Sequence, residues 1–140
     1  MLSATEIRIG VVIAGDSISD EVVVGNLVKF AGLSSSNISI KHVPNDSQVV
    51  MGVLFFAEYT DVDGVVVITN NAGHDWLLCI QKSLYDLQIQ WNMPIEIGSG
   101  YGVAAAESVV RMVQMQYDMA GELPVERSTP ISASRKDNVN

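Results

Sequence analysis

The chain has 140 residues and a formal net charge of −8, from 16 acidic and 8 basic side chains. This acidic balance argues against a nucleic-acid-binding surface, which needs clustered Lys and Arg, and against binding to anionic membranes. Hydrophobic residues make up 48% of the chain, which is enough for one domain with a buried core.

Cys79 is the only cysteine, so the sequence excludes a disulfide framework and a cysteine-based zinc site. The first ten residues lack the charged, apolar and small-residue order of a signal peptide. No apolar run approaches the ~18 residues of a membrane span. His74 and Asp75 are adjacent and diverge on a helix, which is not a metal-ligand spacing. We therefore expect a cytoplasmic protein without a metal or a cofactor.

The first strand is predicted at residues 7–14, "IRIGVVIA", and its nearly continuous apolar character is typical of a parallel strand covered on both faces. Ser19 or Asp20 can cap the helix that follows, and Gly32 can end it. The apolar residues that recur at helical spacing in this segment are Val24, Leu27, Val28 and Ala31.

The second strand is predicted at residues 37–43, where we expect His42 to have a structural role. Asn45 or Asp46 can cap the next helix. Its expected apolar face consists of Val50, Val53, Leu54 and Ala57. After a turn at residues 61–64, the run "VVVIT" predicts the third strand.

The third helix is the clearest, because its apolar residues alternate at steps of three and four. They are Leu77, Ile80, Leu84, Leu87 and Trp91. A short fourth strand is predicted at residues 93–98, and a last helix at residues 104–119. Residues 121–140 are polar, with two prolines and several serines, and predict a flexible tail after a single domain at residues 1–120.

Strands that alternate with helices predict an α/β fold, namely a flavodoxin-like three-layer sandwich with a four-stranded parallel sheet and helices on both faces. Binding sites in such sheets lie outside the carboxyl ends of the strands. In this sequence those ends fall at residues 14–19, 44–48, 69–74 and 98–102.

The third and last helices carry more apolar residues than a four-stranded sheet can cover. The third helix has a second set at Leu78, Cys79 and Ile89, with Tyr85 nearby. In the last helix the apolar residues spread widely around the circumference: Val109, Val110, Met112, Val113, Met115 and Met119. This excess predicts burial against other subunits of a homo-oligomer.

Four segments resemble the lumazine synthase and archaeal-type riboflavin synthase superfamily in their order and spacing over residues 7–119. "RIGVVIAGDSISDEVVVGNL" resembles the family's first strand, loop and helix, and "NISIKHVPNDSQVVMGVLFFAEYTDVDGVVVI" its second unit and third strand. "HDWLLCIQKSLYDLQIQWNMPIEIG" is similar to the long helix and fourth strand, and "YGVAAAESVVRMV" to the final helix. The resemblance implies a transferase of riboflavin biosynthesis that assembles as a pentamer or a multiple of pentamers, with active sites between neighbouring subunits.

The resemblance also implies roles for residues at the strand ends. His74 would be the proton-transfer residue. Alignment from Pro94 instead places it about two positions past the family's histidine, which favours a helix-start residue with an exposed ring. Asp16 to Ser19 can contact a polar ligand or cap the first helix. The substrate-binding residues implied are Ala14, Gly15, Asp16, Asn45, Asp46, Ser47, Gln48, Asn70, Asn71, Gly98, Ser99 and Gly100.

The sequence departs from the family pattern at each part of that site. Ala14 and Gly15 stand where the family has an aromatic residue, and Gln48 stands where it has a glutamate. The loop after the third strand is shorter and lacks the phosphate-binding Gly-x-Thr stretch. No basic residue lies between Lys82 and Arg111, where the family has an arginine. These departures favour a homo-oligomeric, lumazine-synthase-like subunit with a degenerate pocket for a pyrimidine, lumazine or flavin-like molecule. The alternative is an active synthase with a shortened site.

Overall fold

The computed structural model describes residues 2–70 and 73–121. The strands are β1 (Ile9–Ala14), β2 (Ile38–Val43), β3 (Gly64–Ile68) and β4 (Ile95–Gly98). The helices are α1 (Asp20–Ala31), α2 (Val49–Tyr59), α3 (His74–Trp91) and α4 (Val103–Ala120). Short 3₁₀ turns precede three of these elements: η1 (Ala4–Glu6), η2 (Ser35–Asn37) and η3 (Asp46–Gln48).

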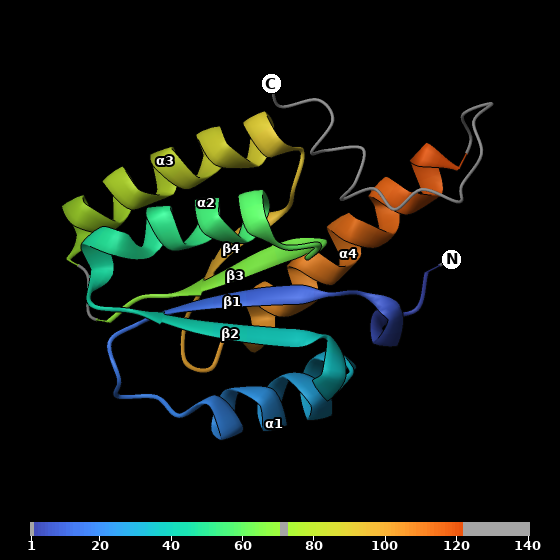
Figure 1. Ribbon diagram of the computed structural model, residues 1–140, viewed down its shortest axis with the longest axis horizontal. Helices are drawn as coiled ribbons and strands as arrows, with labels where there is room; N and C mark the ends of the chain where they lie inside the picture. The colour runs from blue at the N-terminus through green and yellow to red at the C-terminus, as the bar shows by residue number, and fades with distance from the viewer. Residues whose placement is uncertain (1, 71–72, 122–140) are drawn as a thin grey trace.

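The strands form one parallel sheet in the order β2-β1-β3-β4 (Figure 1). This order is flavodoxin-like, with β1 and β3 in the centre. Helices α1 and α4 cover one face of the sheet, and α2 and α3 cover the other. The three-layer α/β sandwich predicted from the sequence is therefore confirmed.

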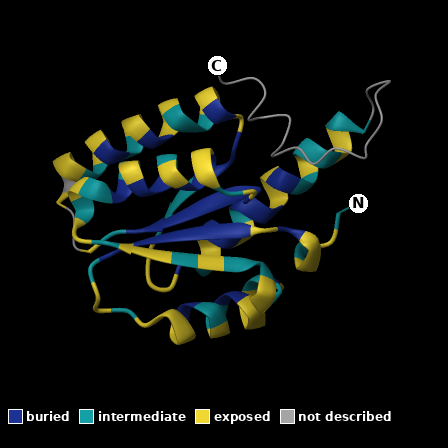
Figure 2. Ribbon diagram, viewed as in Figure 1, coloured by how far each residue is buried: buried dark blue, intermediate teal, exposed yellow. Residues whose placement is uncertain are grey.

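Strand β1 supplies both halves of the core because its side chains alternate between the two faces. Ile9, Val11 and Ile13 pack in the α1–α4 layer, whereas Val12 and Ala14 pack in the α2–α3 layer. Every residue of β1 and β3 is buried, while β2 keeps exposed positions along its length (Figure 2). This contrast is expected of two central strands and an edge strand.

Helix α1 is capped at its start by Ser19, whose side chain accepts a hydrogen bond from the amide of Val22 at 3.4 Å. It is capped at its end by Gly32, which has the left-handed φ of 74° that favours glycine. The expected apolar face was only partly right: Leu27 is buried and Val28 is exposed, while Val23, which was not expected on this face, is buried. Val24 and Ala31 are half-buried. The reason is that α1 packs on one narrow stripe against the sheet and α4.

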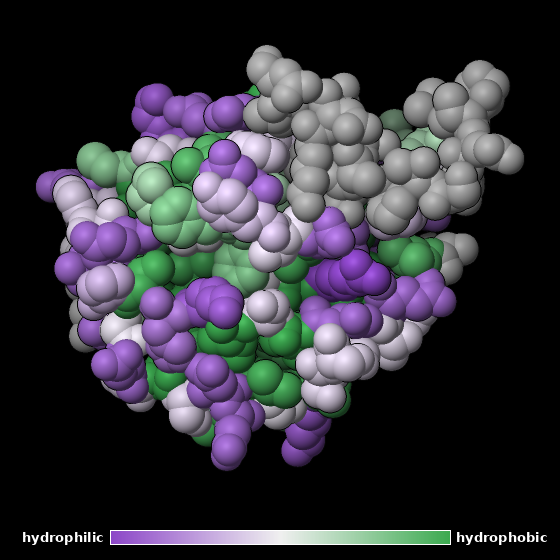
Figure 3. Space-filling model, in the orientation of Figure 1, coloured by the Kyte–Doolittle hydropathy of each residue, from purple (hydrophilic) through white to green (hydrophobic). Residues whose placement is uncertain are grey.

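The second apolar sets of α3 and α4 lie outside the core, as expected from their excess over what the sheet can cover. On α3 the side chains of Leu78, Tyr85 and Ile89 are exposed. On α4 Val109, Val110 and Val113 are buried, but Met112, Met115 and Met119 are exposed. Figure 3 shows that apolar residues also break the polar surface on the opposite side of the molecule, which carries β2. None of the described helices combines the length and the apolar character that a membrane span requires.

Candidate functional site

The carboxyl ends of the four strands meet at one edge of the sheet, on the left of Figure 1. Helices α1 and α3 begin at this edge, and the loops after the strands form its surface. Most of the site residues expected from the sequence lie in these four loops, whereas Ala14 and Gly98 are the last residues of β1 and β4. Asn71 lies outside the described residues. His74 begins α3 at this edge, but its side chain also lies outside the described part of the chain.

A hydrogen bond joins the loops after β2 and β3. The backbone N–H of Asn70 donates to Oδ1 of Asp46 at 2.6 Å. Asp46 lies in η3, directly after β2, and Asn70 is the second residue after β3. A carboxylate that accepts a backbone N–H is a strong, charge-assisted partner. Asp46 therefore fixes the spacing of two loops of the site and has one oxygen that is already engaged.

Most polar side chains of the loop after β2 form hydrogen bonds within the loop itself. Asn45 Oδ1 accepts from the amide of Ser47 at 2.9 Å and also contacts the Ser47 hydroxyl. Gln48 Oε1 in turn accepts from the amide of Asn45 at 3.2 Å, which completes a capping box. Of the binding residues expected here, Asn45, Ser47 and Gln48 thus stabilise their own turn, which holds Val49 at the start of α2.

The loop after β1 approaches the loop after β3. Gly15 has a φ of 80°, and a Cβ atom added to it would lie 3.3 Å from Nδ2 of Asn70. Gly15 also donates its N–H to the carbonyl of Val43 at 2.8 Å. A larger side chain would therefore be strained and would press on Asn70. Ala14, the preceding residue, is buried in the core, so its methyl group does not face the edge.

The loop after β4 contains the remaining expected residues. Gly98 is the last residue of β4, and the exposed Ser99 and Gly100 follow it. The carbonyl of Ser99 accepts from the N–H of Gly102 at 2.9 Å, so the loop is a tight turn into α4. Gly102 has a φ of 80°, and an added Cβ would lie 3.0 Å from Val66. Glycine is needed there because α4 starts directly against β3.

Two exposed aromatic residues at this edge were not among the expected binding residues, although one of them lies within the predicted strand end at residues 98–102. Trp76, in the first turn of α3, is 49% exposed, and Tyr101, in the loop after β4, is 45% exposed. The lumazine synthase resemblance implies an aromatic ring only after the first strand, so it does not point to either residue. The signal that could have identified them is that Tyr101 lies in the loop directly after a strand end and Trp76 lies in the first turn of the helix that follows another.

The carboxyl edge is acidic. Four aspartates lie in its loops and first helical turns: Asp16, Asp20, Asp46 and Asp75. Most basic residues of the described chain lie elsewhere: Arg8 precedes β1, Lys29 is in the last turn of α1, Lys82 pairs with Asp86 at 3.4 Å, and Arg111 lies within α4. The edge is therefore unfavourable for a phosphate group.

The basic groups near this edge are Lys41 and His42, close to the end of β2. His42 Nδ1 lies 2.7 Å from the carbonyl oxygen of Gly15, and its Nε2 lies 2.5 Å from Oδ1 of Asp20. The hydrogen bond to Gly15, followed by that to Asp20, raises the pKa of His42 above its ordinary value. His42 thus ties β2 to the loop after β1 and to α1, which agrees with the structural role expected for it.

Metal chemistry receives no support from the described residues: no three His, Cys, Asp or Glu side chains among residues 2–70 and 73–121 are grouped to hold an ion. Of the four aspartates of the carboxyl edge, Asp46 joins two loops and Asp20 contacts His42 at the start of α1. Asp16 and Asp75 are exposed. The expectation of no metal site stays a prediction.

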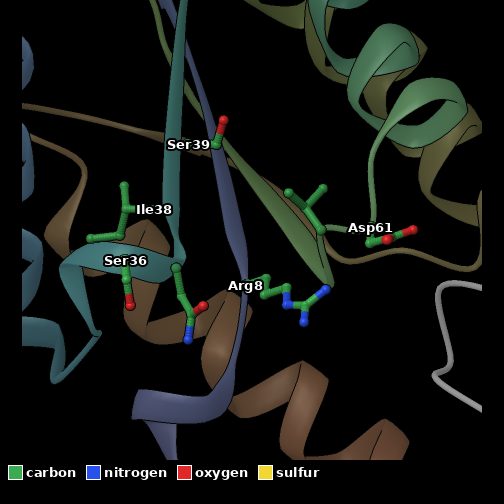
Figure 4. Close-up of a pocket in the computed structure, with 7 residues that line it drawn as sticks. Arg8, Ser36, Ile38, Ser39 and Asp61 are labelled. Carbon is green, nitrogen blue, oxygen red and sulfur yellow. The ribbon is translucent and has the colours of Figure 1, made fainter.

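Two surface hollows lie away from the carboxyl edge. One, of about 340 Å³, is at the amino ends of the strands, where it is lined by Arg8 and Asp61 on one side and by Ser36 and Ile38 on the other (Figure 4). The other is a groove of about 360 Å³ between the C-terminal parts of α3 and α4, beside the residues that lead into β4; we call this surface the β4 edge. Its lining residues are Gln88, Ile89, Asn92, Met93, Pro94, Met112, Met115, Gln116 and Met119.

The sequence matches no protein-family model and no curated protein. Among solved structures, the chain is similar to a de novo designed Rossmann fold protein, with 16% sequence identity and a TM-score of 0.46. The alignment covers 75% of this chain and 95% of the designed one. A similarity of this size carries no argument about function, so the functional inference has to come from the residues of the site and the surface.

Proposed function

We propose that this protein is a lumazine-synthase-like subunit of a homo-oligomer, a pentamer or a multiple of pentamers. Its strand-end site binds a flat, polar small molecule of the pyrimidine, lumazine or flavin class, and it does not catalyse the synthase reaction. The observation that supports the homo-oligomer is the uncharged, apolar groove at the β4 edge. The polar and aromatic residues of the carboxyl edge support the class of ligand.

The groove is suited to contact with another subunit. Ile89 is 80% exposed and Met119 is 61% exposed, although both are strongly apolar. Single exposed apolar residues are normal on a monomer, but here several gather along one edge. None of the nine lining residues carries a charge in a chain whose net charge is −8. Two copies of an acidic chain repel each other least where uncharged surfaces meet.

The carboxyl edge supports a neutral, flat ligand. Trp76 and Tyr101 offer exposed ring faces for stacking, and the exposed side-chain amide of Asn70 offers both a donor and an acceptor. The aspartates around them disfavour anions. A heterocycle with a polar rim therefore suits the edge better than a sugar phosphate does.

The synthase reaction needs a phosphate-bearing substrate, and the chemistry of this edge is poorly suited to one. No arginine lies in the strand-end loops of the described chain. Each missing charge-assisted hydrogen bond weakens binding by roughly 1.5–3 kcal/mol. An active synthase remains the second candidate, favoured by one observation: His74 begins α3 directly beside the strand ends, where a proton-transfer residue would be required.

Riboflavin and 6,7-dimethyl-8-ribityllumazine are fluorescent probes for this proposal. We expect their fluorescence to be quenched on titration with the protein, because stacking on an aromatic ring quenches such dyes. Tyr101→Ala should weaken the binding. The matched control is Tyr85→Ala, which removes a similarly exposed ring on the outer face of α3. No quenching at high micromolar protein would contradict the ligand class.

The second candidate is tested in the same preparation by adding the two synthase substrates. We expect no formation of the fluorescent lumazine. If the product forms, and His74→Gln abolishes its formation, the non-catalytic proposal is wrong and the active synthase replaces it.

A further inference from the structure

The imidazole of His42 lies between two hydrogen-bond acceptors. On one side, Nδ1 is 2.7 Å from the carbonyl oxygen of Gly15, in the loop after β1. On the other side, Nε2 is 2.5 Å from Oδ1 of Asp20, at the start of α1. The ring is partly shielded, with 28% of the side chain exposed, compared with 56% for Asp20.

Both contacts can be hydrogen bonds only when the ring carries two protons. A neutral imidazole has one N–H donor and one acceptor nitrogen, whereas the imidazolium has two donors. A carbonyl oxygen and a carboxylate oxygen can only accept. In the neutral form, one ring nitrogen would therefore direct a lone pair at an oxygen, and one of the two contacts would become repulsive.

The charged groups that act on His42 strengthen this requirement. The hydrogen bonds to Gly15 and Asp20 raise its pKa, burial opposes them, and the negative charges of Asp20 on α1 and Asp16 in the loop raise it further. Lys41, its neighbour on β2, is exposed on the alternate position of the strand. The surroundings therefore favour the imidazolium over the neutral ring.

The same geometry excludes His42 as a general base. A base must present a free nitrogen to the proton that it removes. In a catalytic Asp–His pair, the carboxylate holds one nitrogen and the other faces the substrate. Here the second nitrogen is occupied by the carbonyl of Gly15, so no acceptor is left for a substrate.

We propose that His42 is a positioning residue that controls the shape of the strand-end site with pH. Its imidazolium holds residues 15–19 against the end of β2. Loss of its proton breaks one of the two contacts and loosens that loop. Gly15 lies beside Asn70, so loosening the loop also changes the polar surface that faces a ligand. This inference does not depend on which molecule the site binds.

The test is an NMR titration of the full chain from pH 5 to pH 9. The chain has two histidines, so the ring signal lost in His42→Gln identifies His42. We expect it to titrate above the ordinary value of about 6.5. The amide signals of residues 15–19 should shift with the same midpoint, which a residue with a purely packing role would not produce.

Asp20→Asn is the sharper variant, because it keeps an acceptor oxygen and removes the charge. We expect the midpoints of His42 and of the loop amides to fall together toward 6.5. Glu21→Gln is the matched control, since it removes one charge from the same helical turn without contacting His42 in the described structure, and it should shift the midpoints less. Titration of His42 at or below 6.5, or loop amides without the shared midpoint, would overturn the proposal.

Discussion

The carboxyl edge of the sheet and the β4 edge differ in the chemistry of their exposed side chains and in what those side chains contact. At the carboxyl edge, one hydrogen bond joins Asp46 to Asn70 and another joins His42 to Gly15, in each case between segments that are far apart in the sequence. At the β4 edge, Ile89, Met112, Met115 and Met119 are exposed without polar partners of their own. The first surface is organised within one subunit. The second surface is apolar, so its burial against another subunit would be favourable. For this reason we propose that the subunit contact lies there.

Leu84→Ala should have the largest effect on the subunit itself. Leu84 is on the same helix as Ile89 but only 1% exposed, and it packs between α3 and the sheet. Removing it should lower the free energy of unfolding by about 2–5 kcal/mol, from lost burial and a cavity. Urea denaturation measures this loss, and a change below about 1 kcal/mol would mean that α3 is not packed as described.

Asp46→Ala should have an intermediate effect, centred on the carboxyl edge. It removes the acceptor for the amide of Asn70, and we expect a loss of about 1 kcal/mol because the site is partly exposed. Hydrogen exchange of the Asn70 amide should accelerate. Asp46→Asn keeps an acceptor oxygen and should restore much of the protection. Equal exchange rates in wild type and both variants would contradict the hydrogen bond between the two loops.

The stability contributed by His42 should depend on pH in one direction. Its pKa is raised in the folded state, so the contribution is complete below the unfolded value of about 6.5 and is lost as the pH rises through the folded value. We therefore expect wild type to exceed His42→Gln in urea midpoint at pH 6, with the difference shrinking by pH 9. A difference that grows with pH would contradict the imidazolium assignment.

Ile89→Ala should have the smallest effect on the subunit. Ile89 is 80% exposed, so its loss should change the unfolding free energy of the dissociated subunit by no more than about 0.5 kcal/mol. The same change should weaken association. If it instead destabilises the subunit as much as Leu84→Ala does, the β4 edge is part of the core and is not an open surface.

The architecture could be predicted from the sequence because strand and helix periodicities are local signals. The run "IRIGVVIA" is apolar at almost every position, and β1 is buried throughout. The excess of apolar residues on α3 and α4 could also be recognised from the sequence, because residues such as Leu78 and Ile89 lie outside the apolar stripe that faces the sheet. Predictions were weaker where two faces of a short helix are both apolar, as in α2, where Phe56 and Gly52 are buried beside the expected Val53.

The site was harder to predict because it depends on contacts between loops. The capping box of Asn45 and Gln48 follows from spacing, but the Asp46–Asn70 hydrogen bond joins residues 24 positions apart. The two acceptors of His42 come from two further elements. Likewise, the exposure of Trp76 and Tyr101 depends on what covers them in three dimensions. The lumazine synthase resemblance and the role of His74 stay predictions.

The central claim is that copies of this chain associate through the β4 edge. Sedimentation velocity at micromolar concentration tests it on three proteins: wild type, Met115→Glu/Met119→Glu, and the control Met51→Glu, which places a charge on the exposed face of α2. We predict an oligomer for wild type and the control, and a monomer for the double variant. A monomeric wild type, or an oligomer that survives the double variant, would contradict the claim.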